Sequence, residues 1–497
     1  MKKSNKKLLE NSALYTGATL LLRCFSFLLL PLYTRYLTPS DYGINNIVTG
    51  FTGVATILII VSMHSATPKF YVEYREDHEK IRRYFGTIMM FPIISGILLS
   101  VSYFAVHNIL DNILFENIPY FPIIFISMIS LVFAGTQTMY VSILQAMQDG
   151  RRAVLRSIVV FFIGLIFNIL FVVFLKMGAL GVILSTLIYN SLLFIYSIFD
   201  LKKRGLFKFC IDFKILKENV VYSVFLIPHI LSSTIAAWIS KLFINSNFQL
   251  GTVGIFGVAS QFGSVADLIQ SAVNTAVMPW VFSLIKEDKK ENNKTIQVYS
   301  RSLCWIYCAI FMLLALFNQE VILLFLDKSY AESWTVVPLI VATYFIKIVY
   351  SFYINLLLYS KKASKTVFIA TLSGSAINLI LSYFLIPRWG LYGSVVADII
   401  AMIIRVGIIV FLSRGYNVVG YKLRDFCPTI IMAMVLTGVG LIFSYTKYMY
   451  QVNIFNILYK LAICAVFFAV LFFRNKSAIM GVVKDIFKNR AQKKKLA

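Results

Sequence analysis

Residues 151–181 read RRAVLRSIVVFFIGLIFNILFVVFLKMGALG, and residues 361–393 read KKASKTVFIATLSGSAINLILSYFLIPRWGLYG. Both stretches begin with a basic pair and carry one asparagine inside an apolar run, Asn168 in the first and Asn378 in the second. Both then continue through a Phe-Leu pair to Gly-x-x-Gly, so the landmarks recur at separations of 210 to 212 residues. This spacing predicts that the chain contains a structural duplication.

The composition around these stretches is that of a membrane protein. Of the 497 residues, 59% are hydrophobic and only 14% are charged, and the mean hydropathy is +0.79. Soluble domains have about a quarter of their residues charged, so a soluble globular enzyme is excluded. Because one membrane-spanning helix needs about 20 apolar residues, the apolar runs predict fourteen spans, near residues 12–36, 43–67, 84–106, 119–144, 155–175, 180–200, 219–243, 252–284, 299–318, 334–358, 366–386, 391–413, 426–446 and 453–473.

The duplication pairs the fifth and sixth predicted spans with the eleventh and twelfth. A looser match pairs Glu10–Tyr15, at the start of the first span, with Glu218–Ser223 at the start of the seventh. Because each repeat has an even number of helices, both copies enter the membrane from the same side. They should be related by a pseudo-two-fold axis along the membrane normal, an arrangement found in transporters that work by alternating access.

The predicted fold is therefore an all-α integral membrane protein with two six-helix parallel repeats around a central cleft. We expect four parts: an N-terminal bundle (1–210), a C-terminal bundle (211–415), helices 13 and 14 (416–475) and a basic cytoplasmic tail (476–497).

The basic residues indicate the orientation in the membrane. Of the 47 Lys and Arg residues, 37 lie in the termini and in the connections on the N-terminal side, whereas the opposite side holds six: Arg35, Lys176, Lys241, Lys328, Arg388 and Lys447. By the positive-inside rule, both termini are predicted to be cytoplasmic. This rule accounts for most of the net charge of +25, which therefore indicates no nucleic-acid partner. The basic tail is expected to bind anionic membrane lipids.

The sequence indicates no cofactor or metal site. The six cysteines form no Cys-x-x-Cys pair, and no GxxxxGK[ST] motif is present, so neither a thiolate metal site nor direct use of ATP is expected. No outward loop is long enough for a catalytic domain, which argues against a membrane-embedded polymerase or glycosyltransferase.

Ionisable residues inside predicted spans are candidate functional residues, because each is costly in a bilayer unless it meets a partner or water. Such residues are Arg23, Asp267, Lys347, Asp398 and Arg405. The cations predict an anionic substrate, and arginine suits phosphate because its donors form a planar fork. Lys460, near one end of span 14, is expected instead to extend its amine to the membrane surface.

Arg35 and Lys241 are expected at equivalent outer ends of spans 1 and 7, where they would flank the outer mouth of the cleft. Asp267 is a candidate gate or ion-coupling residue: it could neutralise these two cations, pair with Arg23, or bind a proton or sodium ion. His229 fits a packing role as well as a ligand role. Pro228 removes a helix hydrogen bond and should bend span 7, so it is a candidate hinge.

Three stretches resemble one known family. PLYTRYLTPSDYG at 31–43 resembles the motif at the end of the first helix of polysaccharide-transporter flippases, in the multidrug/oligosaccharidyl-lipid/polysaccharide exporter superfamily. LGTVGIFG at 250–257, and Asn378 followed by IPRWGLYG at 386–393, resemble second-half motifs of the same family. The resemblance extends over residues 10 to about 415 and leaves out spans 13 and 14.

The resemblance implies a flippase that moves undecaprenyl-diphosphate-linked oligosaccharide from the inner to the outer leaflet of a bacterial cytoplasmic membrane, for O-antigen, capsule or related polysaccharides. It also implies that cleft cations meet the diphosphate, a role that Arg23 fits best, with Lys347, Arg405, Arg35 and Lys241 as further candidates. Other polysaccharide-assembly membrane proteins are possible partners. The alternatives are a peptidoglycan-precursor (lipid II) flippase and a drug/cation antiporter, which the cationic residues oppose.

Overall fold

The computed structural model describes residues 17, 27, 29–287, 289–360 and 366–473; the side chain of His229 is also outside the description. The described residues form helices and no strands. The helices are α2 (Leu30–Tyr36), α3 (Pro39–Ile59), α4 (Thr67–Tyr74), α5 (His78–Leu114), α6 (Phe125–Ala146), α7 (Gly150–Asn168), α8 (Gly178–Lys203), α9 (Phe213–Ser223), α10 (Ile227–Asn247), α11 (Leu250–Lys286), α12 (Lys290–Phe325), α13 (Val337–Tyr359), α14 (Val367–Ser413), α15 (Cys427–Gly440), α16 (Ile442–Thr446) and the helix Ile454–Phe473. Short helical turns are η1 (Met63–Ser65), η2 (Tyr120–Ile124), η3 (Ile169–Phe174), η4 (Val224–Leu226), η5 (Lys328–Thr335), η7 (Arg414–Tyr416) and η8 (Leu423–Asp425).

Eleven described helices are long and apolar enough to cross a membrane, or twelve if one bent pair is a single span. The predicted count of fourteen is therefore not confirmed. The first predicted span, 12–36, lies mostly outside the described residues. The predicted spans 366–386 and 391–413 are joined in α14, which is interrupted by the non-helical backbone of Gly390.

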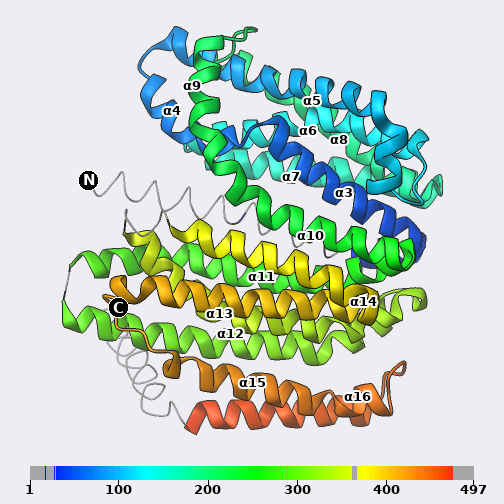
Figure 1. The fold of residues 1–497 in the computed structure, drawn as a ribbon, viewed down its shortest axis with the longest axis vertical. Coiled ribbons are helices and arrows are strands. Elements are labelled where there is room, and N and C mark those ends of the chain that lie inside the picture. Colours follow the sequence, from blue (N-terminus) through cyan, green and yellow to red (C-terminus); the bar gives the residue numbers. More distant parts are fainter. Residues whose placement is uncertain (1–16, 18–26, 28, 288, 361–365, 474–497) are drawn as a thin grey trace, which may run out of the picture.

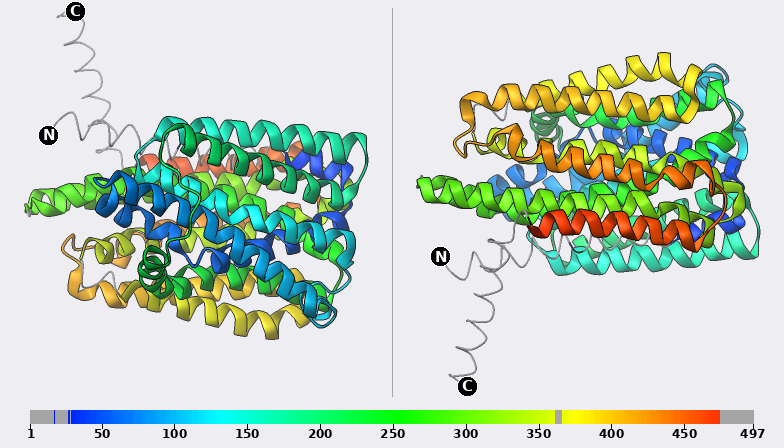
Figure 2. Two further views of the ribbon diagram at one scale, coloured as in Figure 1. Left: turned by 90° about the horizontal axis from the view of Figure 1, so that it is seen from above. Right: turned by 90° about the horizontal axis from the view of Figure 1, so that it is seen from below.

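The long helices run roughly parallel and form two stacked groups (Figures 1 and 2). In one group α5 and α8 pack on α6, and α7 packs on α8. In the other, α13 packs on α11, α12 and α14, and α15 packs on α12. Helix α10 lies between the groups, in contact with α3 and α14, and α3 packs against α11 (Figure 1). The two groups are thus joined mainly through α3, α10 and α11.

The matched first glycines of the two copies both have a positive φ. Gly178 and Gly390 have φ values of +56° and +57°, in the left-handed region that glycine adopts without strain. Three residues later, a Cβ atom at Gly181 would lie 3.1 Å from the backbone of Phe171, and one at Gly393 would lie 2.2 Å from Leu385 O. In both copies the Gly-x-x-Gly therefore allows two helical segments to approach closely, although the turns differ in detail, because Lys176 of the first copy also has a positive φ of +51°.

The motif at the start of α3 is explained by helix capping. Asp41 and Thr38 form a capping box, in which Asp41 N donates to Thr38 Oγ1 and Thr38 N donates to Asp41 Oδ2, each at 3.1 Å. The other carboxylate oxygen of Asp41 accepts from Ala179 N, in the first turn of α8, at 3.1 Å. One carboxylate thus satisfies the N-termini of two helices, where a negative charge is favoured.

The seventh predicted span is bent, but Pro228 does not remove a hydrogen bond from the interior of a helix, as the sequence analysis expected. The segments Phe213–Leu226 and Ile230–Asn247 meet at 58°. Pro228 lies in the first turn of α10, where the missing N–H costs no hydrogen bond. On one side of the bend, Glu218 of α9 accepts from Tyr74 Oη of α4 at 2.7 Å; on the other, α10 packs on α14 and α3.

Candidate functional site: charged residues between the helices

Lys241 on α10 is a cation at the junction of the two helix groups. Its Nζ donates to Asn46 Oδ1 on α3 at 3.1 Å, and Asn46 Nδ2 donates to Tyr42 O at 2.9 Å. Among the described residues Lys241 has no carboxylate partner. A cation within a membrane helix costs about 3 kcal/mol without compensation. An anionic ligand could supply that compensation.

Small residues of α11 make room for this arrangement. A Cβ atom at Gly257 would lie 2.3 Å from Asn46 Nδ2, so only glycine allows the Asn46 side chain to rest there. One turn further along, Gln261 Nε2 donates to Tyr42 Oη at 3.4 Å. The site is therefore built jointly by α3, α10 and α11, which are distant in sequence.

Lys347 and Asp267, both candidates from the sequence, form an ion pair between α13 and α11. Both side chains are about a quarter exposed, at 25% and 26%. The pairing neutralises Lys347, so it offers no uncompensated charge to a substrate in this conformation. It also gives Asp267 a partner that the sequence analysis did not consider, because the two residues are eighty positions apart.

Asp398 and Arg405, on the second part of α14, interact with the first part of the same helix. Asn378 Nδ2 donates to Asp398 Oδ1 at 2.6 Å. Arg405 Nη2 donates to Ser375 Oγ at 2.9 Å, and its side chain covers Gly374, where a Cβ atom would lie 2.1 Å from Arg405 Nε. Within the described part of the chain, nothing accepts a hydrogen bond from the buried Arg405 Nε. Asp398 and Arg405 thus each interact with the first part of α14 and form no ion pair with each other.

The remaining candidates from the sequence, Arg35, Arg23, His229 and Pro228, do not join any of these contacts among the described residues. Arg35 is exposed at the end of α2. Arg23, the residue that best fits the diphosphate role in the sequence, lies outside the described residues. The side chain of His229 is likewise not described, and Pro228 is at the bend given above. The structure thus brings together Lys347 with Asp267, while Lys241 and Arg405 lie in separate contacts.

Two further charged residues, Arg156 and Lys460, have buried contacts that the sequence analysis did not predict. Arg156 of α7 donates from Nη2 to Gln137 Oε1 at 3.0 Å, and its buried Nε has no acceptor among the residues described. Because Arg156 lies at the start of the predicted span 155–175, it was counted among the basic residues of the preceding loop. The expectation for Lys460 was wrong: it is fully buried, and its Nζ pairs with Glu320 Oε1 at 2.6 Å and donates to Gln319 Oε1 at 3.0 Å.

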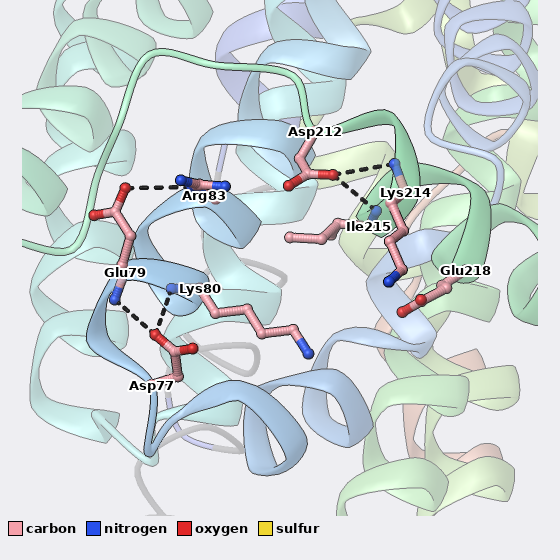
Figure 3. A pocket seen from close by; sticks show the side chains of 8 residues that line it. All are labelled: Asp77, Glu79, Lys80, Arg83, Asp212, Lys214, Ile215 and Glu218. Atoms are coloured by element: carbon pink, nitrogen blue, oxygen red, sulfur yellow. Dashed lines mark hydrogen bonds and ion pairs between the residues drawn. The ribbon is translucent and has the colours of Figure 1, made fainter.

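One pocket of about 360 Å³ lies between the first turns of α5 and α9 (Figure 3). Asp77 accepts from Glu79 N and Lys80 N, and Asp212 accepts from Lys214 N and Ile215 N, so both acids cap helices. The pocket contains none of the candidates named from the sequence. Its lining carries four acidic side chains, Asp77, Glu79, Asp212 and Glu218, beside three basic ones, and Glu79 pairs with Arg83, so the pocket does not favour an anion.

The model of the polysaccharide biosynthesis protein family matches residues 8–285, which is more than half of the chain. The chain belongs to this family. The match includes the capped start of α3, the site around Lys241 and the first glycines of α11. No curated protein sequence matches this family member.

Solved structures share the fold of this family member. The lipid II flippase MurJ in an inward closed conformation is 17% identical, with a TM-score of 0.67 over 93% of this chain and 99% of that one. A multidrug resistance MATE family transporter of the MOP superfamily, in an inward-facing conformation, is 14% identical, with a TM-score of 0.63 over 80% and 95%. A MOP superfamily transporter from Pyrococcus furiosus is 13% identical, with a TM-score of 0.54 over 85% and 97%. The protein therefore has the fold of multi-pass membrane transporters and flippases.

Proposed function

We propose that this protein is a flippase that moves undecaprenyl-diphosphate-linked oligosaccharide from the inner to the outer leaflet of a bacterial cytoplasmic membrane. The observation that carries the proposal is Lys241, a membrane-embedded cation without a carboxylate partner among the described residues, in a chain of the polysaccharide biosynthesis family. A diphosphate supplies the missing negative charge, and charge-assisted hydrogen bonds to phosphate are strong. Arg23 remains a second candidate for the same group.

The proposed mechanism is alternating access by two bundles, 1–210 and 211–415, that rock against each other. The closest contacts between α3 and α11, at Gly43 and Gly254, join the bundles near the ends that carry few basic residues, which by the positive-inside rule face outward. This supports an inward-facing state, with both termini cytoplasmic. The solved structures of MurJ and of the MATE transporter are also described as inward.

The Asp267–Lys347 pair is the proposed coupling element. An ion pair inside the membrane can exchange its partner for a proton or a metal ion, or respond to the membrane potential, because moving one charge across 100 mV is worth about 2.3 kcal/mol. Asp398, which accepts from Asn378, is a second coupling candidate. Pro228, at the bend of span 7, is the proposed hinge.

A lipid II flippase is the alternative, since that substrate also carries a diphosphate. The experiment that separates the two uses the bacterium that encodes this chain. Deleting the gene should abolish surface polysaccharide and accumulate lipid-linked oligosaccharide in the inner leaflet, and the wild-type gene should restore both. Accumulation of a peptidoglycan precursor with normal surface polysaccharide would instead establish the alternative.

The same assay tests the anion site. At matched membrane levels, Lys241→Ala and Arg23→Ala should each lower surface polysaccharide at least tenfold, whereas Lys241→Arg and Arg23→Lys should retain part of it because the charge is kept. Lys447→Ala, which removes an exposed cation outside the site, is the matched control. Full activity of Lys241→Ala would remove Lys241 from the substrate site.

A further inference from the structure

The outer ends of α3 and α11 cross with their backbones in direct contact. A Cβ atom at Gly43 would lie 2.0 Å from Leu250 O, and one at Gly254 would lie 1.9 Å from Pro39 O. Pro39 and Gly43 stand 211 residues before Leu250 and Gly254, so each contact is the copy of the other. The pseudo-two-fold axis of the repeat therefore passes between the two glycines.

The inner ends of α3 and α11 instead form hydrogen bonds within their own helix groups. Ile59 O, at the end of α3, accepts from Ser95 Oγ of α5 at 2.8 Å. Asn274 Oδ1, in the inner part of α11, accepts from Asn355 Nδ2 of α13 at 2.8 Å. For α3 and α11, contact between the groups is thus concentrated at the outer ends. Separation of these ends is the motion that would open the molecule outward.

Several polar contacts bridge the groups beside the crossing, such as the hydrogen bonds from Trp238 Nε1 to Ile47 O at 3.1 Å and from Gln261 Nε2 to Tyr42 Oη at 3.4 Å. Among them, the bond made by Lys241 to Asn46 involves a charged side chain. Asn46 lies one turn inward from Gly43, and its side chain rests on Gly257, which lies one turn inward from Gly254. Its Oδ1 holds Lys241 Nζ, and Lys241 is on α10, which packs on α14 in the second group. Because Asn46 belongs to α3, this hydrogen bond cannot survive if α3 leaves α10 and α11.

We propose that the Lys241–Asn46 hydrogen bond is a latch that holds the outer ends of α3 and α11 together, and that an anion bound by Lys241 releases it. The bond exists in the closed state and not in the open one, so it shifts the equilibrium toward closure. A phosphate oxygen is a stronger acceptor for the ammonium than an amide oxygen, so an anion replaces Asn46 and removes the bias. This second step rests on the proposed function; the latch itself does not.

The test measures the distance between the two outer ends in the full chain. Spin labels at Ser40→Cys, at the start of α3, and Lys328→Cys, at the start of η5, report separation of the groups by pulsed electron paramagnetic resonance in lipid nanodiscs, after replacement of the native cysteines. Both side chains are exposed. The label pair Lys328→Cys with Lys447→Cys, both on the second group, is the control and should not change.

Asn46→Ala and Lys241→Met should each raise the ratio of long to short distances about tenfold, which is the effect expected from losing one hydrogen bond to a charged group. Asn46→Asp should have the opposite effect, because it converts the latch into an ion pair. An unchanged control distance verifies that each variant is folded. Distances that are the same in Asn46→Ala, Asn46→Asp and the parent would overturn the latch.

Undecaprenyl diphosphate in the nanodisc is the anion probe. It should raise the fraction of long label-to-label distances in the parent protein, and it should leave this fraction unchanged in Lys241→Met. If Asn46→Ala opens the molecule but the probe does not, release by an anion is overturned while the latch stands. The cellular assay for surface polysaccharide then shows independently whether the proposed function also fails.

Discussion

At the scale of single residues, the partner of a charge decides its role. Lys241, Lys347 and Lys460 are all cations in apolar helices, but their surroundings differ. Lys347 is paired with Asp267, and Lys460 is buried in contact with Glu320. Among the described residues, Lys241 has only the amide oxygen of Asn46 as an acceptor. Only the last arrangement leaves a positive charge to be neutralised by a ligand, which is why the proposed function rests on Lys241.

Lys460 has a structural role, and its removal should destabilise the protein. Lys460→Ala would leave the buried carboxylate of Glu320 unpaired, which costs about 3–5 kcal/mol for a buried pair. We expect a lower apparent melting temperature in detergent, followed by the fluorescence of buried tryptophans. The double variant Lys460→Met/Glu320→Leu should recover most of the loss, because two apolar side chains replace the pair. Equal loss in the single and double variants would contradict this explanation.

At the scale of elements, capping and close packing position the helices of the site. Asp41 ties the start of α3 to the start of α8, and Gly43, Gly254 and Gly257 allow α3 and α11 to approach closely. These residues are in or beside the motifs that the chain shares with its family. Part of the motif similarity therefore reflects helix packing rather than substrate contact.

Asp41→Ala should weaken the junction of α3 and α8. The variant keeps the bond from Asp41 N to Thr38 Oγ1 but loses the reciprocal half of the capping box, in which Thr38 N donates to Asp41 Oδ2, and the hydrogen bond from Ala179 N. The loss of one such hydrogen bond costs about 1 kcal/mol. We expect a lower apparent melting temperature, measured in the same detergent as the wild type. Ser40→Ala, which changes an exposed neighbour without a capping role, should have little effect. A melting temperature equal to that of the wild type would show that the caps are dispensable.

At the scale of the whole molecule, the two helix groups must separate at their outer ends if the protein works by alternating access. A Cβ atom at Gly251 would lie 3.6 Å from Ser40 Oγ, close enough for a disulfide between α3 and α11. In a chain without native cysteines, oxidation of Ser40→Cys/Gly251→Cys should abolish surface polysaccharide, and reduction should restore it.

The matched control places a disulfide inside one group. Gly96 of α5 and Val132 of α6 offer similar geometry, with 3.7 Å between an ideal Cβ at Gly96 and Val132 Cβ. Gly96→Cys/Val132→Cys should cross-link without loss of transport. If the cross-link between Ser40→Cys and Gly251→Cys forms completely and transport continues, the outer ends do not need to separate.

The class of the protein and its internal repeat could be predicted from the sequence, because both depend on local patterns. Apolar runs of about 20 residues must be buried in lipid, and glycines repeated 212 residues apart indicate a turn with positive φ in each copy. The pairing of the charges, by contrast, became known from the packing of the helices. Lys347 with Asp267 and Lys460 with Glu320 are 80 and 140 residues apart, and their pairing depends on the rotation and packing of whole helices, which no local pattern encodes. For the same reason, the crossing that places Asn46 between Gly257 and Lys241 became visible only when the two halves were brought together.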